Sequence, residues 1–508
     1  MGDSSLEEVG NKLCQLKPGQ FSHLISHRLP KKGSPLSELK FIDATYLYRQ
    51  KNLPRALPGL TISSISFEDV NQYSECISIF LSAMDRTLPI SISVHEQMRY
   101  FWDLIGYYNS LFEENKEIDS LLYDNTPHLP WDICLFYVAK ALNKKVIIVR
   151  KTGIRGYLYI DEDFRPGKTN WKENYENIIN PLKSIISKNY FIEDLRDLSF
   201  SKGQINGMWP YSVVIKKVSL IKKIIRYKRF KRFKNFLLSF IAIVKNVPNN
   251  KCGASESSGQ NTVLSGLKPI SRWRYYKLCN QYAKHINDCE KAYKLCITKK
   301  PNLEEPFVYL PLHLQPERTT MPEGLYFDNQ ILMIRMLAAG LPDGWKIIVK
   351  EHPRQMVKYD MRSRHARSTY EYHSISKIEN VIIVPVKDSH DQLVNKCKLT
   401  ATISGSVSWE GLLIGKPSLI FSENWHANCK STVFVRSERE VHSAIEYLRA
   451  KTKERVEIDV CSFVKDIHGF LVNAALNNTH LKMFFKKENK YKSAENLSSA
   501  ILQRLIKQ

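Results

Sequence analysis

Polar side chains that could bind an anion or move a proton are concentrated in four short segments of the second half of the chain. These segments are 313–324 (HLQPERTTMPEG), 350–354 (KEHPR), 404–417 (SGSVSWEGLLIGKP) and 422–426 (SENWH). Each follows a run of apolar residues typical of a buried strand. In open parallel α/β sheets, ligands bind outside the carboxyl ends of the strands, so a site is expected where these segments meet.

The segment 350–354 places Lys350, His352 and Arg354 in one loop at the end of a strand, and Pro353 fixes the local backbone. Cationic and polar donors in such a loop suit the phosphate of a nucleotide or a departing phosphate. An ordinary solvated surface loop accounts for the same residues equally well.

The turn formed by Ser404, Gly405 and Ser406 opens a predicted helix. The free backbone N–H groups, the hydroxyls and the positive end of the helix dipole suit a phosphate there. The alternative is that a serine simply caps the helix. Glu410 lies one to two turns into the same helix, where its carboxylate could accept hydrogen bonds from ribose hydroxyls or could simply face solvent.

Several common site motifs are missing from the sequence. No GxGxxG follows a strand, and no GxxxxGK[ST] or HExxH occurs, which disfavours dinucleotide oxidoreductases, P-loop NTPases and zinc proteases. The ten cysteines are scattered without a CxxC pair, so we interpret them as reduced thiols. We therefore expect neither a metal nor a cofactor.

The second half alternates predicted strands and helices. Strands are expected at 307–312, 345–350, 381–385, 399–403 and 417–421, and helices at 273–295, 327–339, 391–397 and 407–414. Five strands with helices between them predict a doubly wound, Rossmann-like domain.

The first half predicts the same class of structure. A helix is expected at 95–114, then a strand at 118–123, a helix at 131–142 and a strand at 145–150. Strand, helix and strand at this spacing form a βαβ unit with parallel strands. The first of these strands ends in the segment 124–128 (DNTPH), which contains His128.

The length of 508 residues predicts two domains. We expect an N-terminal domain at 1–200, a basic helix and flexible linker at 201–269, and a C-terminal domain at 270–508. The longest strongly apolar stretch falls well short of the ~18 residues that a membrane span needs. The N-terminus lacks the pattern of a signal peptide, so a cytoplasmic location is expected.

The net charge is +24, and more than half of this excess lies in one stretch. Residues 199–255 contain thirteen Lys or Arg and no Asp or Glu, and ten of the thirteen lie within 216–234. Apolar residues recur at spacings of three and four from there to Val244, which predicts an apolar stripe on a basic helix.

Such a helix can lie in the headgroup region of an anionic membrane. The alternatives are a solvated basic face and nucleic-acid binding; the latter is disfavoured because the aromatic residues fall on the apolar stripe and no recognition motif accompanies them. We expect an anionic membrane surface, the inner face of the cytoplasmic membrane, as a partner, and no nucleic acid. The expected membrane-binding cations are Lys222, Lys223, Arg226, Arg229 and Arg232.

The order of the motifs QPER, KEHP and SGSVSWEGLLIGKP, each after a strand, resembles that of the bacterial capsule polysaccharide biosynthesis proteins, and more broadly of the Kdo transferase-like glycosyltransferases. The resemblance covers about 305–425. It implies an α/β fold with two Rossmann-like domains facing across a cleft, the GT-B architecture, here with a basic helical insertion between them. It also implies a nucleotide-sugar site that includes Gln315, Arg318, Lys350, His352, Ser404, Gly405, Ser406 and Glu410.

The function expected from the residues and this resemblance is sugar transfer from a nucleotide-activated donor, such as a CMP-Kdo-like donor, to a surface polysaccharide or its lipid-linked acceptor. Glu317 is the leading catalytic carboxylate, and His128 is the alternative base. Two alternative functions remain open. One is a glycerophosphate or polyol-phosphate transferase of wall-polymer synthesis, and the other is a non-catalytic polysaccharide-assembly protein on the same fold.

Overall fold

The structure is a computed structural model. It describes residues 4–27, 29–44, 46–48, 62–87, 93–166, 168, 192–199, 272–297, 300–357, 367–476, 481 and 490–506. The basic segment 216–245 lies outside the described residues, together with the expected membrane-binding cations Lys222, Lys223, Arg226, Arg229 and Arg232.

The second half of the chain forms a six-stranded sheet in which every neighbouring pair is parallel. Its strands are β6 (Phe307–Pro311), β7 (Lys346–Lys350), β8 (Val381–Val384), β9 (Leu399–Thr402), β10 (Ser418–Ile420) and β11 (Thr432–Phe434). The spatial order is β8-β7-β6-β9-β10-β11, which is the 3-2-1-4-5-6 order of a Rossmann fold. The five expected strands are confirmed, and β11 is an additional edge strand of three residues.

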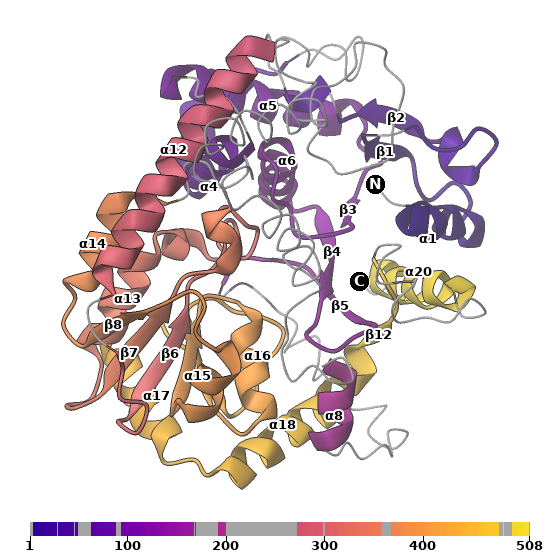
Figure 1. The fold of residues 1–508 in the computed structure, drawn as a ribbon. Coiled ribbons are helices and arrows are strands. Elements are labelled where there is room, and N and C mark those ends of the chain that lie inside the picture. Colours follow the sequence, from indigo (N-terminus) through magenta and orange to yellow (C-terminus); the bar gives the residue numbers. More distant parts are fainter. Residues whose placement is uncertain are drawn as a thin grey trace, which may run out of the picture.

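Helices cover both faces of this sheet (Figure 1). One face packs on α12 (Arg272–Cys296), α13 (Gln330–Ala339), α14 (Thr369–Ser376) and α17 (Glu438–Arg449). The other face packs on α15 (His390–Lys396) and α16 (Ser406–Leu413), and α18 (Lys453–Ile467) packs against α16. Strand residues alternate between the two cores, so the sheet is buried on both sides and its strands read as nearly continuous apolar runs.

A smaller sheet, the mixed sheet, has the order β12-β5-β4-β3 and takes three strands from the first half of the chain and one from its last part. Its strands are β3 (Ser120–Tyr123), β4 (Lys145–Lys151), β5 (Tyr157–Asp161) and β12 (Val472–Asn473). The strands β3 and β4 are parallel and joined by α6 (Pro130–Ala141), which confirms the predicted βαβ unit. However, β5 runs antiparallel to β4, and β12 antiparallel to β5.

The sequence predicts a parallel sheet from this βαβ unit, whereas the two further strands, β5 and β12, make the sheet mixed. The physical reason lies in the short connection between β4 and β5. Thr152 Oγ1 accepts a hydrogen bond from Ile154 N (3.1 Å) and donates to Tyr157 O (2.8 Å), which closes a tight turn. A turn this short can join only antiparallel neighbours, because a parallel crossover needs a dozen or more residues.

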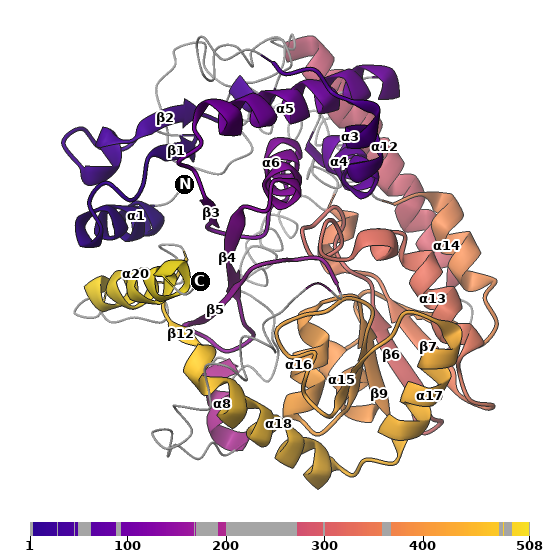
Figure 2. The ribbon, with the colours of Figure 1, turned by 180° about the vertical axis from the view of Figure 1, so that it is seen from behind.

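The mixed sheet is also covered on both faces, as the view from behind shows (Figure 2). One face packs on α4 (Ser74–Thr87), α5 (Val94–Glu114) and α6, and the other on α1 (Ser4–Leu16) and α20 (Lys490–Ile506). A separate parallel pair, β1 (His23–Ser26) and β2 (Lys40–Asp43), lies near α1. The remaining helical elements are α3 (Phe67–Gln72), α8 (Ile192–Ser199) and the 3-10 turns at Pro35–Glu38, Tyr46–Tyr48, Leu325–Asp328, Pro353–Met356 and His468–Phe470.

The end of the chain returns to the first sheet. After α18, strand β12 pairs with β5, and α20 then packs against α1 and the sheet. The mixed sheet is thus assembled from segments that are more than 300 residues apart in the sequence.

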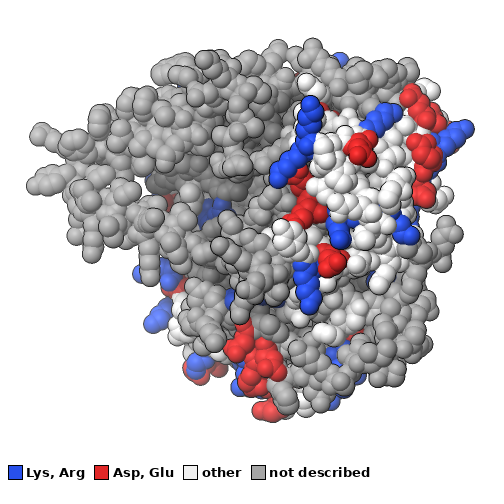
Figure 3. Space-filling model, turned by 90° about the vertical axis from the view of Figure 1, so that its right-hand side faces the viewer, with Lys and Arg blue, Asp and Glu red and all other residues white. Residues whose placement is uncertain are grey.

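On the face that carries α1 and α20, acidic and basic side chains of the described residues are interspersed (Figure 3). Among the described helices, none is long and apolar enough to cross a membrane.

The core beneath α13 provides a test of the fold. Leu337 is fully buried there, whereas Leu332 on the same helix is 43% exposed. We expect Leu337→Ala to lower the free energy of unfolding by about 2–5 kcal/mol, because it removes apolar contacts and leaves a cavity. Leu332→Ala is the matched control and should change it by less than about 0.5 kcal/mol. Urea unfolding measures both, and equal effects would contradict the packing described here.

Candidate functional site at the carboxyl edge of the six-stranded sheet

The strand order reverses between β6 and β9, and the loops that follow these strands meet at this point. In doubly wound sheets this switch point is where ligands bind. His313, just after β6, reaches across to β9: its Nε2 lies 2.7 Å from Thr402 Oγ1 and accepts a hydrogen bond from Ile403 N (3.2 Å). Burial lowers the pKa of His313 to about 3, so its imidazole is neutral and serves as a fixed link between the two loops.

Gly405 lies against this link. A Cβ atom at this position would be 2.7 Å from Thr402 Oγ1 and 3.0 Å from His313 Cε1, so any larger residue would displace the link. Gly405 N donates to Thr402 Oγ1 (3.1 Å). Glycine is therefore required here by close packing.

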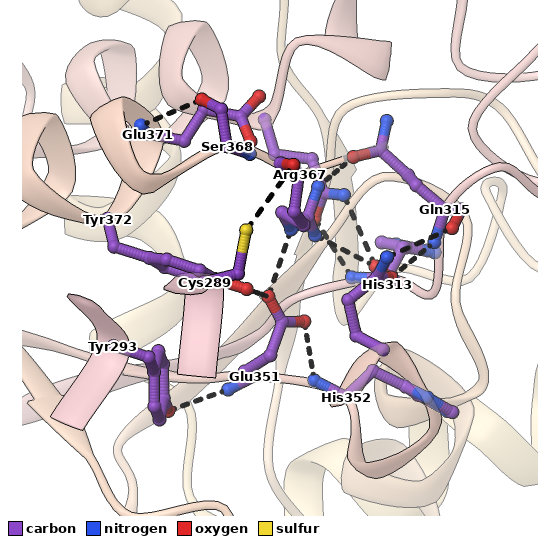
Figure 4. Close-up of polar contacts among 12 residues, drawn as sticks. Cys289, Tyr293, His313, Gln315, Glu351, His352, Arg367, Ser368, Glu371 and Tyr372 are labelled. Carbon is purple, nitrogen blue, oxygen red and sulfur yellow. Dashed lines mark hydrogen bonds and ion pairs between the residues drawn. The ribbon is translucent and has the colours of Figure 1, made fainter. Parts of the chain in front are cut away.

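A buried ion pair holds the loop after β7. Glu351 is 1% exposed, and its Oε2 accepts hydrogen bonds from Arg367 Nε (2.9 Å) and from Tyr372 Oη (2.7 Å). Its Oε1 accepts from the backbone N–H of His352 (2.7 Å), and its own backbone N–H donates to Tyr293 Oη (3.0 Å). Figure 4 shows Glu351 at the centre of these contacts.

Arg367 extends the same network to the loop after β6. Its Nη2 donates to His313 O (3.0 Å), and its Nη1 donates to Gln315 Oε1 (Figure 4). Burial disfavours its charge, but the carboxylate of Glu351 outweighs this and raises the pKa of Arg367. Removing one member of such a buried pair typically costs about 3–5 kcal/mol, so Glu351 and Arg367 fix the relative positions of the two loops.

Gln315 is placed by hydrogen bonds at both ends of its amide. Its Oε1 accepts from Arg367, and its Nε2 donates to Asp328 O. Its backbone N–H donates to the side chain of Gln355 (2.9 Å). The structure therefore gives Gln315 a clear part in holding the loop after β6.

Lys350 and His352 occupy different environments. Lys350 is 6% exposed, its Nζ donates to Asp388 O (2.6 Å), and burial lowers its pKa. His352 is half-buried; its Nδ1 accepts from Arg354 N (3.2 Å), and burial lowers its pKa to about 4. His352 is thus a neutral imidazole near pH 7, able to hydrogen-bond a ligand without contributing a full positive charge.

Helix α16 begins without a side-chain cap, because its N-cap residue is Gly405. Ser404, the serine that could have capped it, donates its hydroxyl to Thr319 O (3.1 Å) instead. Ser406 is exposed at the first position of the helix. The first-turn N–H groups of α16 are therefore presented at the sheet edge in the manner that suits an anion.

Glu410 is further inside the structure than a solvent-facing helix residue would be. Its Oε2 lies 2.8 Å from His390 Nε2, and His390 Nδ1 lies 3.0 Å from Tyr309 Oη. Burial would raise the pKa of Glu410, but hydrogen bonds from His390 and Ser406 outweigh it and hold the pKa below its usual range. Glu410 is therefore a carboxylate, fixed in place beside the start of α16.

The loop after β6 contacts the loop after β3 through Glu323. Glu323 is 4% exposed, and its Oε1 accepts a hydrogen bond from Thr126 Oγ1 (2.6 Å). The same oxygen lies 3.2 Å from Arg318 Nε and 3.4 Å from Arg150 Nη2. Arg318 in turn donates to Asn125 Oδ1. We call this group, Glu323 with Arg150, Arg318, Asn125 and Thr126, the inter-sheet cluster.

The two proposed bases differ in position. Glu317 is exposed in the loop after β6. His128 is half-buried in the loop after β3, where its Nδ1 donates to Thr126 O (2.8 Å). His128 is close enough to the inter-sheet cluster to lower the pKa of Glu323.

Sequence reasoning missed Glu351, Arg367, His313 and Glu323. Glu351, His313 and Glu323 lie within segments that were singled out, so their positions after strands were visible. The sequence does not show which of the neighbouring side chains in each segment turns inward. Arg367 lies outside these segments and gives no sequence signal of its own.

Among the described residues, no group of three or more His, Cys, Asp or Glu side chains is placed to hold a metal ion. The site is thus built from hydrogen-bond donors, two buried ion-pair networks and one uncapped helix start.

No family model matches this chain, and no curated protein sequence does. The similar solved structures include two KpsC enzymes of Thermosulfurimonas dismutans. The β-Kdo 2,4 transferase is 18% identical over 32% of this chain and 55% of its own, with a TM-score of 0.21. The β-Kdo 2,7 transferase is 12% identical over 37% and 65%, with a TM-score of 0.20.

A third similar structure is the UDP-GlcNAc 2-epimerase of Neisseria meningitidis bound to UDP-GlcNAc. It is 16% identical over 86% of this chain and 90% of its own, with a TM-score of 0.23. The matches to the KpsC enzymes span less than two thirds of those chains. At these identities and TM-scores, no activity is assigned to this chain from the similarity.

The inter-sheet cluster predicts a pH-dependent stability. Burial would raise the pKa of Glu323, but Arg318, Arg150 and the hydrogen bond from Thr126 outweigh it and hold the pKa below its usual range. A lowered carboxyl pKa stabilises the fold above the pKa of the unfolded chain, and this contribution is lost as the pH falls through the folded-state pKa.

We expect Glu323→Gln to lower the free energy of unfolding at pH 7 by about 3 kcal/mol, because two guanidinium groups lose a buried carboxylate. The difference in the free energy of unfolding between this variant and the wild type should shrink as the pH falls below 4. Urea unfolding between pH 7 and pH 3 measures this, with the exposed Glu317→Gln as the matched control. A difference that is independent of pH would contradict the assignment.

Proposed function

We propose that this chain is a glycosyltransferase that moves a sugar from a nucleotide-activated donor to a surface polysaccharide or its lipid-linked acceptor. The six-stranded domain holds the nucleotide, and the domain of the mixed sheet faces the acceptor. One observation carries the proposal: the loops with the QPER, KEHP and SGSVSWEG motifs meet at the switch point of a 3-2-1-4-5-6 sheet. Doubly wound sheets bind nucleotides at this point.

Glycosyl transfer places negative charge on the departing phosphate, and preorganised donors stabilise it. The first-turn N–H groups at the uncapped start of α16 supply such donors. His352, as a neutral imidazole, and Arg354 add donors from the neighbouring loop. Because Glu351 and Arg367 fix these loops before a ligand arrives, little reorganisation is needed during the reaction.

Transfer to a hydroxyl also needs a group that accepts its proton. Glu317 is the proposed base, since it is an exposed carboxylate at the same sheet edge. His128 is the alternative, since an imidazole can accept a proton and Thr126 O fixes the ring in the loop after β3. In the donor site, Glu410 is proposed to accept hydrogen bonds from ribose hydroxyls.

Association with the inner face of an anionic membrane is a further part of the proposal. It rests on the sequence of 216–245, including Lys222, Lys223, Arg226, Arg229 and Arg232, which lies outside the described residues. A membrane-bound enzyme would meet a lipid-linked acceptor without searching the solvent.

The nucleotide site is tested by thermal unfolding with CMP, CDP, UDP and GDP. A nucleotide that binds should stabilise the protein by about 2.7 kcal/mol at a hundredfold excess over its Kd, seen as a rise in Tm. We expect His352→Ala and Ser404→Ala to remove this rise while the protein stays folded. His442→Ala and Ser443→Ala, on the exposed face of α17, are the matched controls. An unchanged rise in both site variants would place the nucleotide elsewhere.

The role of Glu317 is tested by Glu317→Gln, which keeps the size of the side chain but removes its basicity. With a donor of the nucleotide identified above, kcat should fall by about 10²–10⁴-fold, the usual contribution of a positioned proton-transfer group. Nucleotide affinity should be retained. Glu305→Gln, at an exposed position before β6, is the control. Near-normal turnover in Glu317→Gln would refute the role as base and favour His128.

A further inference from the structure

A hydrogen-bonded row of three side chains leads from the core of the six-stranded sheet to the start of α16. Tyr309 is fully buried in β6, and its hydroxyl oxygen lies 3.0 Å from His390 Nδ1. The other ring nitrogen of His390, Nε2, lies 2.8 Å from Glu410 Oε2. The rings of Tyr309 and His390 also meet edge to face, with their centroids 5.5 Å apart. His390, the first residue of α15, is therefore held at both of its ring nitrogens.

The direction of the hydrogen bond between His390 and Glu410 follows from the charge of the carboxylate. Burial would raise the pKa of Glu410, but the hydrogen bonds from His390 and Ser406 keep it below its usual range. Glu410 is thus ionised near pH 7 and can only accept, so His390 Nε2 is the donor.

The carboxylate of Glu410 has capacity for further hydrogen bonds. An ionised carboxylate offers about four acceptor positions, and His390 and Ser406 each donate to one of them. In the described part of the chain, about two positions are thus left for a ligand. The side chain of Glu410 is 13% exposed and that of His390 is 28% exposed, so a ligand can reach them from the solvent.

Glu410 also lies at a suitable distance from the first-turn N–H groups of α16. Ser406 and Glu410 are four residues apart, which places them on the same face of the helix, about 6 Å apart along its axis. Side chains of a helix tilt toward its N-terminus, so the carboxylate extends toward the helix start. A ligand with a phosphate at the helix start would therefore have its neighbouring hydroxyl groups beside Glu410.

We propose that His390 is the positioning residue that makes this site selective for ribonucleotides. It holds Glu410 so that the carboxylate accepts hydrogen bonds from both hydroxyls of the ribose, and Tyr309 in turn holds His390. This role of His390 rests on the proposed function and names the part of the nucleotide that is selected. A 2′-deoxynucleotide would leave one acceptor position of a largely buried carboxylate without a donor.

The reason for holding the carboxylate is entropic as well as geometric. A free glutamate side chain has several rotatable bonds, and ordering it on ligand binding costs affinity. Because His390 and Ser406 order Glu410 before a ligand arrives, this cost is not incurred when the nucleotide binds. A hydrogen bond to an ionised group then contributes about 10- to 100-fold to affinity.

The experiment compares a ribonucleotide with its 2′-deoxy counterpart by calorimetric titration of the full-length protein. The base and phosphate number are those of whichever of CMP, CDP, UDP and GDP raises the Tm most. The wild type should prefer the ribonucleotide by about 10- to 100-fold, and His390→Ala should reduce this preference to less than about threefold. The loss should fall mainly on the ribonucleotide. Gln392→Ala, at an exposed position of the same helix, is the matched control and should keep the preference.

Two further variants retain part of the arrangement. His390→Gln keeps an N–H donor for Glu410 and should retain more of the preference than His390→Ala. Tyr309→Phe keeps the ring but removes the hydroxyl that holds His390, so it should reduce the preference by less than His390→Ala does. The Tm of each variant without nucleotide checks that it is folded.

A double variant distinguishes positioning from a general structural role. Glu410→Gln should reduce the preference for the ribonucleotide, and adding His390→Ala to it should cause no further loss, because His390 acts through Glu410. If His390 only stabilised the fold, its replacement would weaken both nucleotides equally and would add to the effect of Glu410→Gln.

The outcomes separate this role of His390 from the proposed function. A wild-type protein that binds the ribose and 2′-deoxy forms equally would overturn the selectivity while leaving the nucleotide site in place. An unchanged preference in folded His390→Ala, or additive losses in the double variant, would overturn the role of His390 alone. If none of the four nucleotides raises the Tm, the proposed function fails, and the role of His390 fails with it.

Discussion

The buried ion pair between Glu351 and Arg367 is the interaction on which the arrangement of the candidate site depends. Burying a carboxylate and a guanidinium costs desolvation free energy unless each of their polar atoms finds a hydrogen-bond partner. Here Tyr372, the backbone N–H of His352 and the carbonyl oxygen of His313 supply those partners. The loops after β6 and β7 therefore cannot move independently. Their positions are set by electrostatics inside the domain and not by contact with a ligand.

The inter-sheet cluster joins the six-stranded sheet to the mixed sheet through buried charges. Glu323 comes from the loop after β6, whereas Thr126 and Arg150 come from the mixed sheet. Loops at strand ends of two different sheets are thus joined by a buried carboxylate and two guanidinium groups. A change of charge at Glu323 therefore affects the loops of both sheets, because each sheet contributes residues to the cluster.

The sequence predicts the six-stranded sheet well, since strands such as 307–310 are short apolar runs buried on both faces, bounded by polar loops. It fails at β11, whose three residues at the sheet edge carry too little pattern, and at β5, whose direction is decided by the turn at Thr152. In the site, sequence places whole segments at strand ends. It cannot tell that Glu351 turns inward while its neighbour His352 does not, because that choice depends on Arg367 and Tyr372 arriving from elsewhere.

The pairing of β12 with β5 has a consequence for how the chain folds. The mixed sheet gains its last strand, and α1 gains the helix α20 as a neighbour, only from residues beyond 471. Contacts between such distant segments form slowly, because a long loop must close first. During synthesis, only α1 can cover the apolar face of β4 and β5 until the rest of the chain has emerged, so the domain begun first is completed last.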